Sequence, residues 1–376
     1  MFHVEHSNFG VYIHVPFCVS KCGYCDFCRV TDLSLRDAYL DALEKEIAAS
    51  KIVRMSPRTV YVGGGTPSCL GVAGVSRLLG IVNNYLKTDG VEEWTVECNP
   101  EDVNIELARA LRSAGVGRVS MGAQSLFDPM LKYMGRRHNA RRVYDAIDTL
   151  RAAGVDNISV DCIYGLPAVD GYRVEDDFRR FAALDVEHLS AYSLQYEEGS
   201  RFSQMADDGR LTPTDDDDVA DQYDTLTAIL REAGYLHYEI SNYARPGREA
   251  RHNSSYWNRT DYYGFGPAAS SFASGVRTTN TRDVREYIAS AASAHDLVET
   301  LTTEDVFCEV VMLGLRTSRG MAVADVPEEY LPAFLRAADS QRQLGNIIDL
   351  PGGRLRIPEN RWMISDSIIR QLTVNS

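Results

Sequence analysis

The sequence predicts an α/β protein built on a barrel or partial barrel of parallel strands. Through the first two thirds of the chain, short apolar segments alternate with amphipathic segments of helical period. Strands separated by helices are typical of βαβ units, whose strands lie in one parallel sheet. Six such units follow one another, and glycine-rich or polar stretches come directly after several strands. In a (β/α) barrel such stretches meet at the carboxyl ends of the strands, where the functional site is built.

Strands and helices are expected in alternation along this part of the chain. The six expected strands are short and apolar, and they cover Gly10–Val15, Thr59–Val62, Trp94–Glu97, Arg118–Met121, Ile158–Ile163 and His188–Leu194. The five expected helices have apolar residues at helical spacing, and they cover Leu35–Val53, Val72–Leu86, Ile105–Ala114, Ala140–Ala153 and Val174–Leu184.

The pattern changes in the last third of the chain. An acidic run within Thr212–Asp218 precedes an apolar-periodic helix that ends at Ala233. We interpret this run as a solvated helix start, because acidic residues are favoured at a helix N-terminus, with a metal site as the alternative. Leu236–Ile240 is expected to be a further strand. After about residue 280 the pattern becomes helical, and Gly353–Pro358 with Arg361–Ser365 is expected to form a small hairpin.

The length of 376 residues allows one large barrel with an extension. We expect three parts, which are a barrel at residues 1–240, a connecting segment at residues 241–301, and a small C-terminal α+β domain at residues 302–376.

Composition and charge narrow the function classes. The chain has 39 Lys and Arg against 53 Asp and Glu, a net charge of −14, which disfavours nucleic acid as a partner because phosphate binding needs clustered basic residues. No apolar run approaches the ~20 residues of a membrane helix, and the N-terminus lacks the basic and apolar regions of a secretory signal. Eight Cys residues are too few for a disulfide scaffold. We therefore expect a cytoplasmic protein.

The most informative feature of the sequence is the C-x3-C-x2-C cluster of Cys18, Cys22 and Cys25. Iron–sulfur clusters are normally held by four Cys thiolates, so three thiolates on one loop predict a cubic cluster with one iron open to a small molecule. A zinc site is the alternative, but zinc usually takes two separated pairs of ligands, and the sequence has no second pair. Buried cysteines are the other alternative, and they do not need this clustering.

Polar or glycine-rich stretches follow four of the expected strands, at Gly63–Ser68, Glu97–Pro100, Gly122–Ser125 and Tyr164–Pro167. Glycine has no Cβ, so the first stretch allows a close approach between the backbone and a ligand, with a tight turn as the alternative. It lacks the Lys-Ser/Thr pair of a nucleotide-binding P-loop. Glu97 can accept hydrogen bonds from an amine or a ribose hydroxyl, unless it is a surface carboxylate. The further polar candidates near strand ends are Gln124, Arg136 and Asp161.

A series of motifs resembles the radical S-adenosylmethionine (SAM) superfamily, in the branch of oxygen-independent coproporphyrinogen III oxidases and HemW-type heme chaperones. The series runs through nearly the whole chain, at Tyr12–Cys18, Gly63–Ser68, Glu97–Pro100, Ser120–Ser125, Asp161–Pro167, Tyr238–Asn242 and Ile364–Ile369. The resemblance implies a partial (β/α)6 TIM-like radical SAM barrel, followed by a C-terminal domain like that of the oxidases (HemN).

The resemblance also implies cofactors and the residues that bind them. Cys18, Cys22 and Cys25 would bind a [4Fe–4S] cluster, and SAM would chelate the open iron and be cleaved to a 5′-deoxyadenosyl radical. Residues implied to contact SAM or the cluster are Tyr12, Tyr24, Gly64, Gly65, Thr66 and Glu97. Residues that match a second SAM site in the oxidases are Gln124, Arg136 and Asp161.

Two places distinguish the chaperones from the oxidases. The oxidases have a fourth Cys at the position of Phe27, whereas this chain has Cys28 one residue later. We do not expect Cys28 to be the fourth ligand, although C-x3-C-x2-C-x2-C could close a four-thiolate site. The second place is the H-N-x-x-Y-W motif associated with heme binding in the HemW branch, which is formed here by His252, Tyr256 and Trp257.

The chemistry of the H-N-x-x-Y-W motif suits heme. Imidazole is a common heme ligand, and Tyr256 with Trp257 offers a flat aromatic surface for a porphyrin. A structural aromatic cluster with a hydrogen-bonded His252 is the alternative. A nearby loop, Gly264–Ser270, has Ser270 where the family usually has His, and this puts a heme or substrate role for that loop in doubt.

Three functions follow from the resemblance. The first is a HemW-like heme chaperone that binds heme, a [4Fe–4S] cluster and SAM and delivers heme to acceptor proteins such as respiratory hemoproteins. The second is an oxygen-independent coproporphyrinogen III oxidase, which decarboxylates two propionates. The third is a radical SAM enzyme for another substrate. A homodimer and a peripheral contact with a membrane are left open by the sequence.

Overall fold

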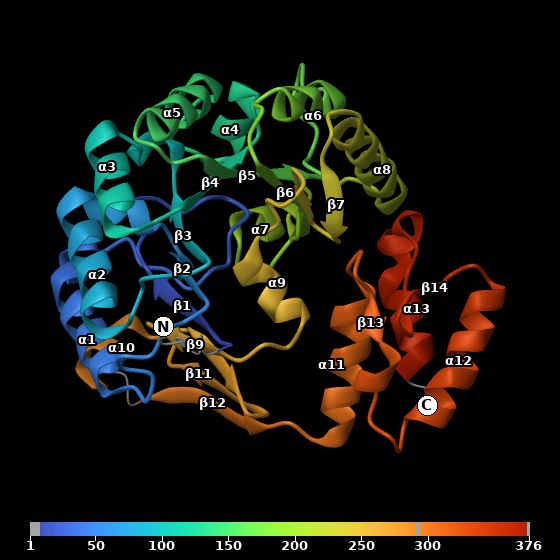
Figure 1. Ribbon diagram of the computed structural model, residues 1–376. Coiled ribbons are helices and arrows are strands. Elements are labelled where there is room, and N and C mark those ends of the chain that lie inside the picture. The colour runs from blue at the N-terminus through green and yellow to red at the C-terminus, as the bar shows by residue number, and fades with distance from the viewer. Residues whose placement is uncertain (1–7, 291–293, 374–376) are drawn as a thin grey trace.

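An open sheet of twelve strands forms the frame of the molecule (Figure 1). The computed structural model describes residues 8–290 and 294–373, so residues 1–6, which were considered for a secretory signal, lie outside the described ranges. The spatial order of the strands is β12-β11-β10-β9-β1-β2-β3-β4-β5-β6-β8-β7. The six expected strands are adjacent and parallel, and they are β1 (Gly10–Val15), β2 (Thr59–Gly64), β3 (Glu93–Cys98), β4 (Arg118–Gln124), β5 (Asn157–Tyr164) and β6 (His188–Ser193). The sequence-based prediction of a partial barrel is confirmed.

Helices cover the outer, convex face of these strands (Figure 1). Those that the sequence predicts are α1 (Arg36–Ala49), α2 (Gly71–Tyr85), α3 (Ile105–Ala114), α5 (Ala140–Ala152), α6 (Val174–Ala182) and α8 (Asp216–Glu232). The sequence pattern missed α4 (Asp128–Met134) and α7 (Arg201–Asp207), because two helical turns are too short to show a period. Among the described helices, none is long and apolar enough to cross a bilayer.

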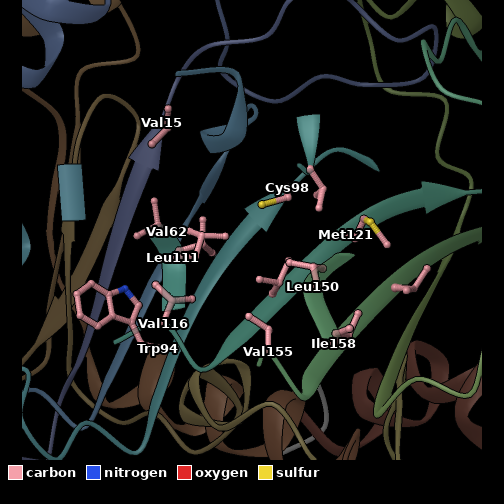
Figure 2. Close-up of a cluster of buried hydrophobic side chains, with 14 of the residues drawn as sticks. Val15, Val62, Trp94, Cys98, Leu111, Val116, Met121, Leu150, Val155 and Ile158 are labelled. Atoms are coloured by element: carbon pink, nitrogen blue, oxygen red, sulfur yellow. The ribbon is translucent and has the colours of Figure 1, made fainter. Parts of the chain in front are cut away.

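The main hydrophobic core lies between the parallel strands and the helices outside them. Figure 2 shows side chains from strands β1 to β5 interleaved with Leu111 of α3 and Leu150 of α5. Successive side chains of a strand point to opposite faces of a sheet. Because Val62 and Cys98 face this core, their neighbours Tyr61 and Glu97 point to the concave inner face. The alternation of the strands thus decides which side chains reach the interior of the barrel.

Residues 241–301, expected as a connecting segment, contribute strands to both edges of the sheet. At one edge, β8 (Asn242–Ala244) pairs antiparallel with β6 and with β7 (Leu236–Glu239). At the other edge, β9 (Tyr262–Phe265) is parallel to β1 and is followed by β10 (Ser270–Ala273), β11 (Val276–Asn280) and β12 (His295–Thr300). The expectation of helix after residue 280 is right for α10 (Val284–Ser290) and wrong for β12, an exposed edge strand whose residues show no alternation between buried and exposed faces.

The C-terminal elements form a second, smaller unit beside the open barrel (Figure 1). Its helices are α11 (Thr303–Leu315), α12 (Leu331–Gln343) and α13 (Ser365–Thr373), and its strands are β13 (Met321–Ala322), β14 (Ile348–Leu350) and β15 (Arg354–Arg356). A separate apolar cluster around Phe307, Phe334 and Trp362 holds them together. The predicted hairpin is half wrong: β15 pairs with β14 and β13, whereas Glu359–Ile364 is a 3-10 helix that buries Trp362.

Candidate functional site

A cavity of about 390 Å³ opens at the carboxyl ends of the parallel strands. Eleven of the fifteen predicted site residues line it, and they come from the cysteine loop after β1 and from β2 to β5 and the loops that follow these strands. These residues are Cys18, Cys22, Tyr24, Cys25, Gly64, Gly65, Thr66, Glu97, Gln124, Arg136 and Asp161. The four that do not line the cavity are Tyr12, His252, Tyr256 and Trp257.

The cysteine loop is held at its base by backbone hydrogen bonds. The amide of Cys18 donates to the carbonyl of Val30, and the amide of Val30 donates to the carbonyl of Pro16. The Cys18 thiol lies 3.4 Å from the Thr66 hydroxyl of the glycine-rich stretch. Burial raises the pKa of the Cys18 and Cys25 thiols, so metal binding must deprotonate them.

The thiols of Cys18, Cys22 and Cys25 all line one cavity. Within residues 8–290 and 294–373, no three Cys, His, Asp or Glu side chains are close enough together to hold one metal ion. A mononuclear zinc site needs its thiolates about 2.3 Å from the metal. Three thiolates spread around one cavity are a donor set that fits a multi-iron cluster, which distributes its ligands over several iron atoms.

Cys28 points away from this cavity. Its thiol donates a hydrogen bond to the carbonyl of Arg282, at 3.2 Å, and Cys28 does not line the cavity. Phe27, which stands where the oxidases have their fourth Cys, lines the cavity and is 63% exposed. The loop therefore separates Cys28 from the other three cysteines.

The glycine run after β2 is required by close contacts within the protein. A Cβ on Gly63 would lie 2.8 Å from the Glu97 carboxyl group, and a Cβ on Gly64 would lie 2.8 Å from the His14 ring. A Cβ on Gly65 would lie 2.7 Å from the carbonyl oxygen of Phe17, the residue before Cys18. Gly64 also has a φ of 113°, which side chains disfavour. The run thus lets β2 approach the cysteine loop, and Gly64 and Gly65 still line the cavity.

Glu97 lies on the inner face at the end of β3 and has two hydrogen-bond donors. The Tyr61 hydroxyl donates to its Oε1 at 2.7 Å, and the Gly64 amide donates to its Oε2 at 3.1 Å. Burial raises the pKa of Glu97 to about 7, and the hydrogen bond from Tyr61 opposes this rise. Glu97 is therefore a half-buried carboxyl group in the cavity lining that changes charge near neutral pH.

Arg136 carries a positive charge into the same cavity. Its guanidinium donates to the Gly122 carbonyl at 2.6 Å and to Asn99 Oδ1 at 2.8 Å, and it lies 3.5 Å from the Cys22 thiol. Asn99 in turn donates to the Thr66 hydroxyl at 3.2 Å.

Gln124 and Asp161 line the cavity on the side of β4 and β5. Gln124 has a φ of 69°, which is uncommon for a residue other than glycine, at an irregularity in the pairing of β4 with β5. Burial raises the pKa of Asp161 to about 6. Strained backbone and shifted carboxyl groups cluster at functional sites, which supports the functional interpretation of both residues.

Tyr12 lies behind the cavity and contacts the cysteine loop through a neighbour. Its hydroxyl donates to His14 Nδ1 at 3.0 Å, and His14 Nε2 donates to the Cys28 carbonyl at 2.9 Å. Tyr12 was expected to contact SAM or the cluster, but it does not line the cavity. On this geometry Tyr12 supports the backbone of the loop.

The H-N-x-x-Y-W motif forms helix α9 (Arg251–Trp257). His252 is 1% exposed, and both of its ring nitrogens lie within hydrogen-bond distance of a hydroxyl. Nδ1 is 2.8 Å from Thr59 Oγ1, and Nε2 is 2.8 Å from the Tyr256 hydroxyl. These contacts match the alternative to heme binding, in which His252 is a hydrogen-bonded residue within a structural aromatic cluster.

The Gly264–Ser270 loop also lies apart from the cavity. The Ser270 hydroxyl is 2.8 Å from the Thr279 hydroxyl across the β10–β11 pair. A Cβ on Gly264 of β9 would lie 2.1 Å from the carbonyl oxygen of Ser270 in β10, so this glycine permits β9 and β10 to approach each other. Neither residue lines the cavity.

Sequence reasoning missed the contribution of β6 to the cavity. Tyr192 and Ser193 at the end of β6, and Gln195 and Glu197 in the loop after it, all line the cavity. The segment His188–Leu194 was expected to be a strand, so the rule that parallel strands present their carboxyl ends to the site would have identified these residues.

Known proteins resemble this chain along most of its length. A model of the radical SAM superfamily matches residues 12–181. The chain is 36% identical over 327 residues to the "Heme chaperone HemW" of Lactococcus lactis subsp. lactis (strain IL1403), covering 86% of each chain. It is 35% identical over 381 residues to the protein of the same description from Mycobacterium tuberculosis (strain ATCC 25618 / H37Rv), covering 97% of this chain and 94% of the relative.

The fold also resembles a solved structure over almost its whole length. The chain superposes on the coproporphyrinogen III oxidase (HemN) of Escherichia coli with a TM-score of 0.81, covering 98% of this chain and 92% of the other. The two sequences are 20% identical, so this likeness concerns the fold alone.

Proposed function

Because this chain belongs to the HemW family of the radical SAM superfamily, we propose that it is a heme chaperone, which binds heme and passes it to acceptor proteins. The observation that carries the proposal is the 35% identity to a relative of that description along 97% of the chain. Identity of this extent includes the cysteine loop, the barrel and the C-terminal unit, and not only the region that radical SAM proteins have in common.

We propose that Cys18, Cys22 and Cys25 hold a [4Fe–4S] cluster and leave one iron for SAM. The fit rests on three thiols around one cavity, with Cys28 turned toward Arg282. When bound and reduced, such a cluster supplies an electron that can cleave the sulfonium bond of SAM. The guanidinium of Arg136, 3.5 Å from the Cys22 thiol, offsets negative charge on the loop.

The remaining cavity residues provide the groups that SAM requires. Gly64, Gly65 and Thr66 line the part of the cavity where we place its aminoacyl end. Glu97 in its charged form can accept hydrogen bonds from the amino group of SAM. Tyr24, Gln124 and Asp161 line the rest of the cavity and are proposed to contact the nucleoside or a second SAM.

We further propose how the chain is organised and where it acts. Residues 1–240 would carry the SAM site, residues 241–301 would complete the sheet, and residues 302–376 would form the C-terminal domain. The acceptors would be hemoproteins, including respiratory ones, and the site of action would be the cytoplasm. Homodimer formation and contact with a membrane surface would belong to the delivery step.

A heme titration under anaerobic conditions tests the proposed function. The purified protein is reconstituted with iron and sulfide, and heme is added while the Soret absorbance is followed. We expect saturable binding with one heme per chain. Absence of saturable binding by the reconstituted protein would overturn the proposal. Deoxyadenosine release that does not depend on any porphyrin would instead indicate a radical SAM enzyme for another substrate.

A further inference from the structure

We infer that helix α9 plugs the amino-terminal end of the barrel and that its His252 is a positioning residue for the proposed SAM pocket, acting through Tyr61 and Glu97. This role differs from that of an axial heme ligand. The inference rests on the proposed SAM site, since Glu97 matters here through its contact with SAM.

The plug is fixed by strands from both halves of the barrel. Helix α9 lies inside the curve of the sheet (Figure 1). The Glu93 carboxylate of β3 accepts hydrogen bonds from the amides of Arg251 and His252, at 2.8 and 2.9 Å. The Tyr238 hydroxyl of β7 accepts one from the Ala250 amide at 3.2 Å. The first turn of α9 therefore has its free amides satisfied by the barrel, which fixes its position.

His252 has no ring nitrogen available for iron in this arrangement. A heme iron binds the lone pair of an imidazole nitrogen, and both nitrogens of His252 are occupied by Thr59 and Tyr256. Burial lowers the pKa of His252 to about 3, so the ring is neutral at physiological pH. A Cβ on Gly10 would lie 3.2 Å from the His252 ring, so β1 closes tightly over it. Heme could reach this nitrogen only if α9 left the barrel.

A chain of contacts leads from His252 to the cavity. The His252 ring stacks on Tyr61, with centroids 5.2 Å apart and planes at 28°. Tyr12 stacks on Tyr61 at 6.1 Å. The two contacts set the position of Tyr61, whose hydroxyl donates to Glu97 at 2.7 Å. A carboxylate shielded from water is destabilised when it loses a hydrogen-bond donor. A shift of Tyr61 away from Glu97 therefore changes the charge and position of the Glu97 carboxyl group.

The test compares SAM binding and heme binding in the same reconstituted samples. The variants are His252→Ala, His252→Gln and Tyr61→Phe, and Arg251→Ala serves as the matched control. Arg251 shares α9 with His252, but its side chain is exposed and pairs with Glu92 at the surface. SAM affinity is measured by equilibrium dialysis. The electron paramagnetic resonance spectrum of the reduced cluster is recorded with and without SAM.

We expect His252→Ala and Tyr61→Phe each to weaken SAM binding about tenfold. An effect of this size corresponds to the loss of one hydrogen bond to a charged group. Both should change the SAM-dependent spectrum, His252→Gln should restore part of the affinity, and Arg251→Ala should match the wild type. Heme affinity should be unchanged in all four variants. Tyr61→Phe keeps the aromatic stack, so it tests the relay even if His252→Ala fails to fold.

Two results would overturn the inference. One is loss of heme binding in the His252 variants with unchanged SAM affinity, which would make His252 an axial ligand. The other is wild-type SAM affinity in Tyr61→Phe, which would show that the contact chain has no effect. If the wild type itself bound no SAM, the proposed cofactor would fail together with the inference, whereas the two results above leave the proposed SAM site intact.

Discussion

At the scale of single residues, Cys28 differs from its three neighbours in its surroundings. Its thiol is engaged by the Arg282 carbonyl, whereas Cys25 lines the cavity. We predict that Cys28→Ser retains the iron content and visible absorbance of the reconstituted wild type, and that Cys25→Ser loses the cluster. Iron and sulfide analysis of both variants is the measurement. Loss of the cluster in both variants would indicate a four-thiolate site that includes Cys28 and leaves no iron open for SAM, and loss in Cys28→Ser alone would contradict the proposed ligand set.

Glu97 makes SAM binding dependent on pH. Its pKa is raised to about 7, chiefly by burial, so the carboxyl group is mostly neutral at pH 6 and mostly charged at pH 8. The charged groups that face it are Asp161, which raises the pKa of Glu97, and Arg118, which lowers it. We predict that SAM binding tightens as the pH rises from 6 to 8, because the charged carboxylate accepts hydrogen bonds from the SAM amino group more strongly than the neutral acid does.

The matched variant for this pH dependence is Glu97→Gln, which keeps the size of the side chain and cannot ionise. Dissociation constants are measured at half-unit intervals of pH for both proteins. The difference between the two profiles should appear around pH 7. Parallel profiles for wild type and variant would contradict a contact between Glu97 and SAM.

At the scale of elements, we predict that a Gly→Ala substitution is harmful in the glycine run after β2 and stabilising in helix α2. Gly65→Ala would force the new Cβ against the Phe17 carbonyl, so we expect it to displace the cysteine loop and lower cluster content. Gly80→Ala lies within α2, where a Cβ meets no atom within 4 Å. We expect it to raise the free energy of unfolding by about 0.5–1 kcal/mol. Urea denaturation and iron analysis check both, and wild-type iron content in Gly65→Ala would contradict the close approach.

The sequence predicted regular elements well and irregular ones poorly. The bounds of α3 agree with the structure at both ends, because Asn104 caps its start and Gly115 ends it. Strand β12 was missed, since its exposed residues have no partner face to create an alternating pattern. The hairpin at Arg354 was paired with the wrong segment, because strand pairing is a long-range choice that a local pattern does not record.

At the scale of the whole molecule, Glu309 ties the C-terminal unit to the barrel. It lies on α11 and pairs with Arg259, which follows α9, and with Arg277 of β11. We predict that Glu309→Ala lowers the free energy of unfolding by about 2 kcal/mol, because Arg259 and Arg277 both lose this carboxylate, although Arg277 keeps its pair with the more exposed Glu299.

An exposed ion pair provides the control for Glu309. Asp176 pairs with Arg173, with side chains 61% and 77% exposed, and such surface pairs contribute about 0–1 kcal/mol. Asp176→Ala should therefore change stability little. Equal effects of the two substitutions in urea denaturation would contradict the tie between α11 and the barrel.

The sequence could predict which residues meet at the carboxyl ends of the parallel strands. It could not predict the role of a residue that depends on its contacts in the folded protein. The rule for parallel strands brought Glu97, Asp161 and the cysteine loop to one cavity. The same sequence pattern fits His252 as a heme ligand or as a buried anchor. The contacts with Thr59 and Tyr256 distinguish these roles, and the contact with Thr59 joins residues 193 positions apart.

The central claim is that this chain carries heme rather than makes porphyrin. One anaerobic sample with a reconstituted cluster, SAM and a reductant tests it directly, when half is titrated with heme and half is incubated with coproporphyrinogen III. We expect the protein to bind heme saturably and to form no vinyl-bearing product. Vinyl-bearing product together with an absence of saturable heme binding would contradict it.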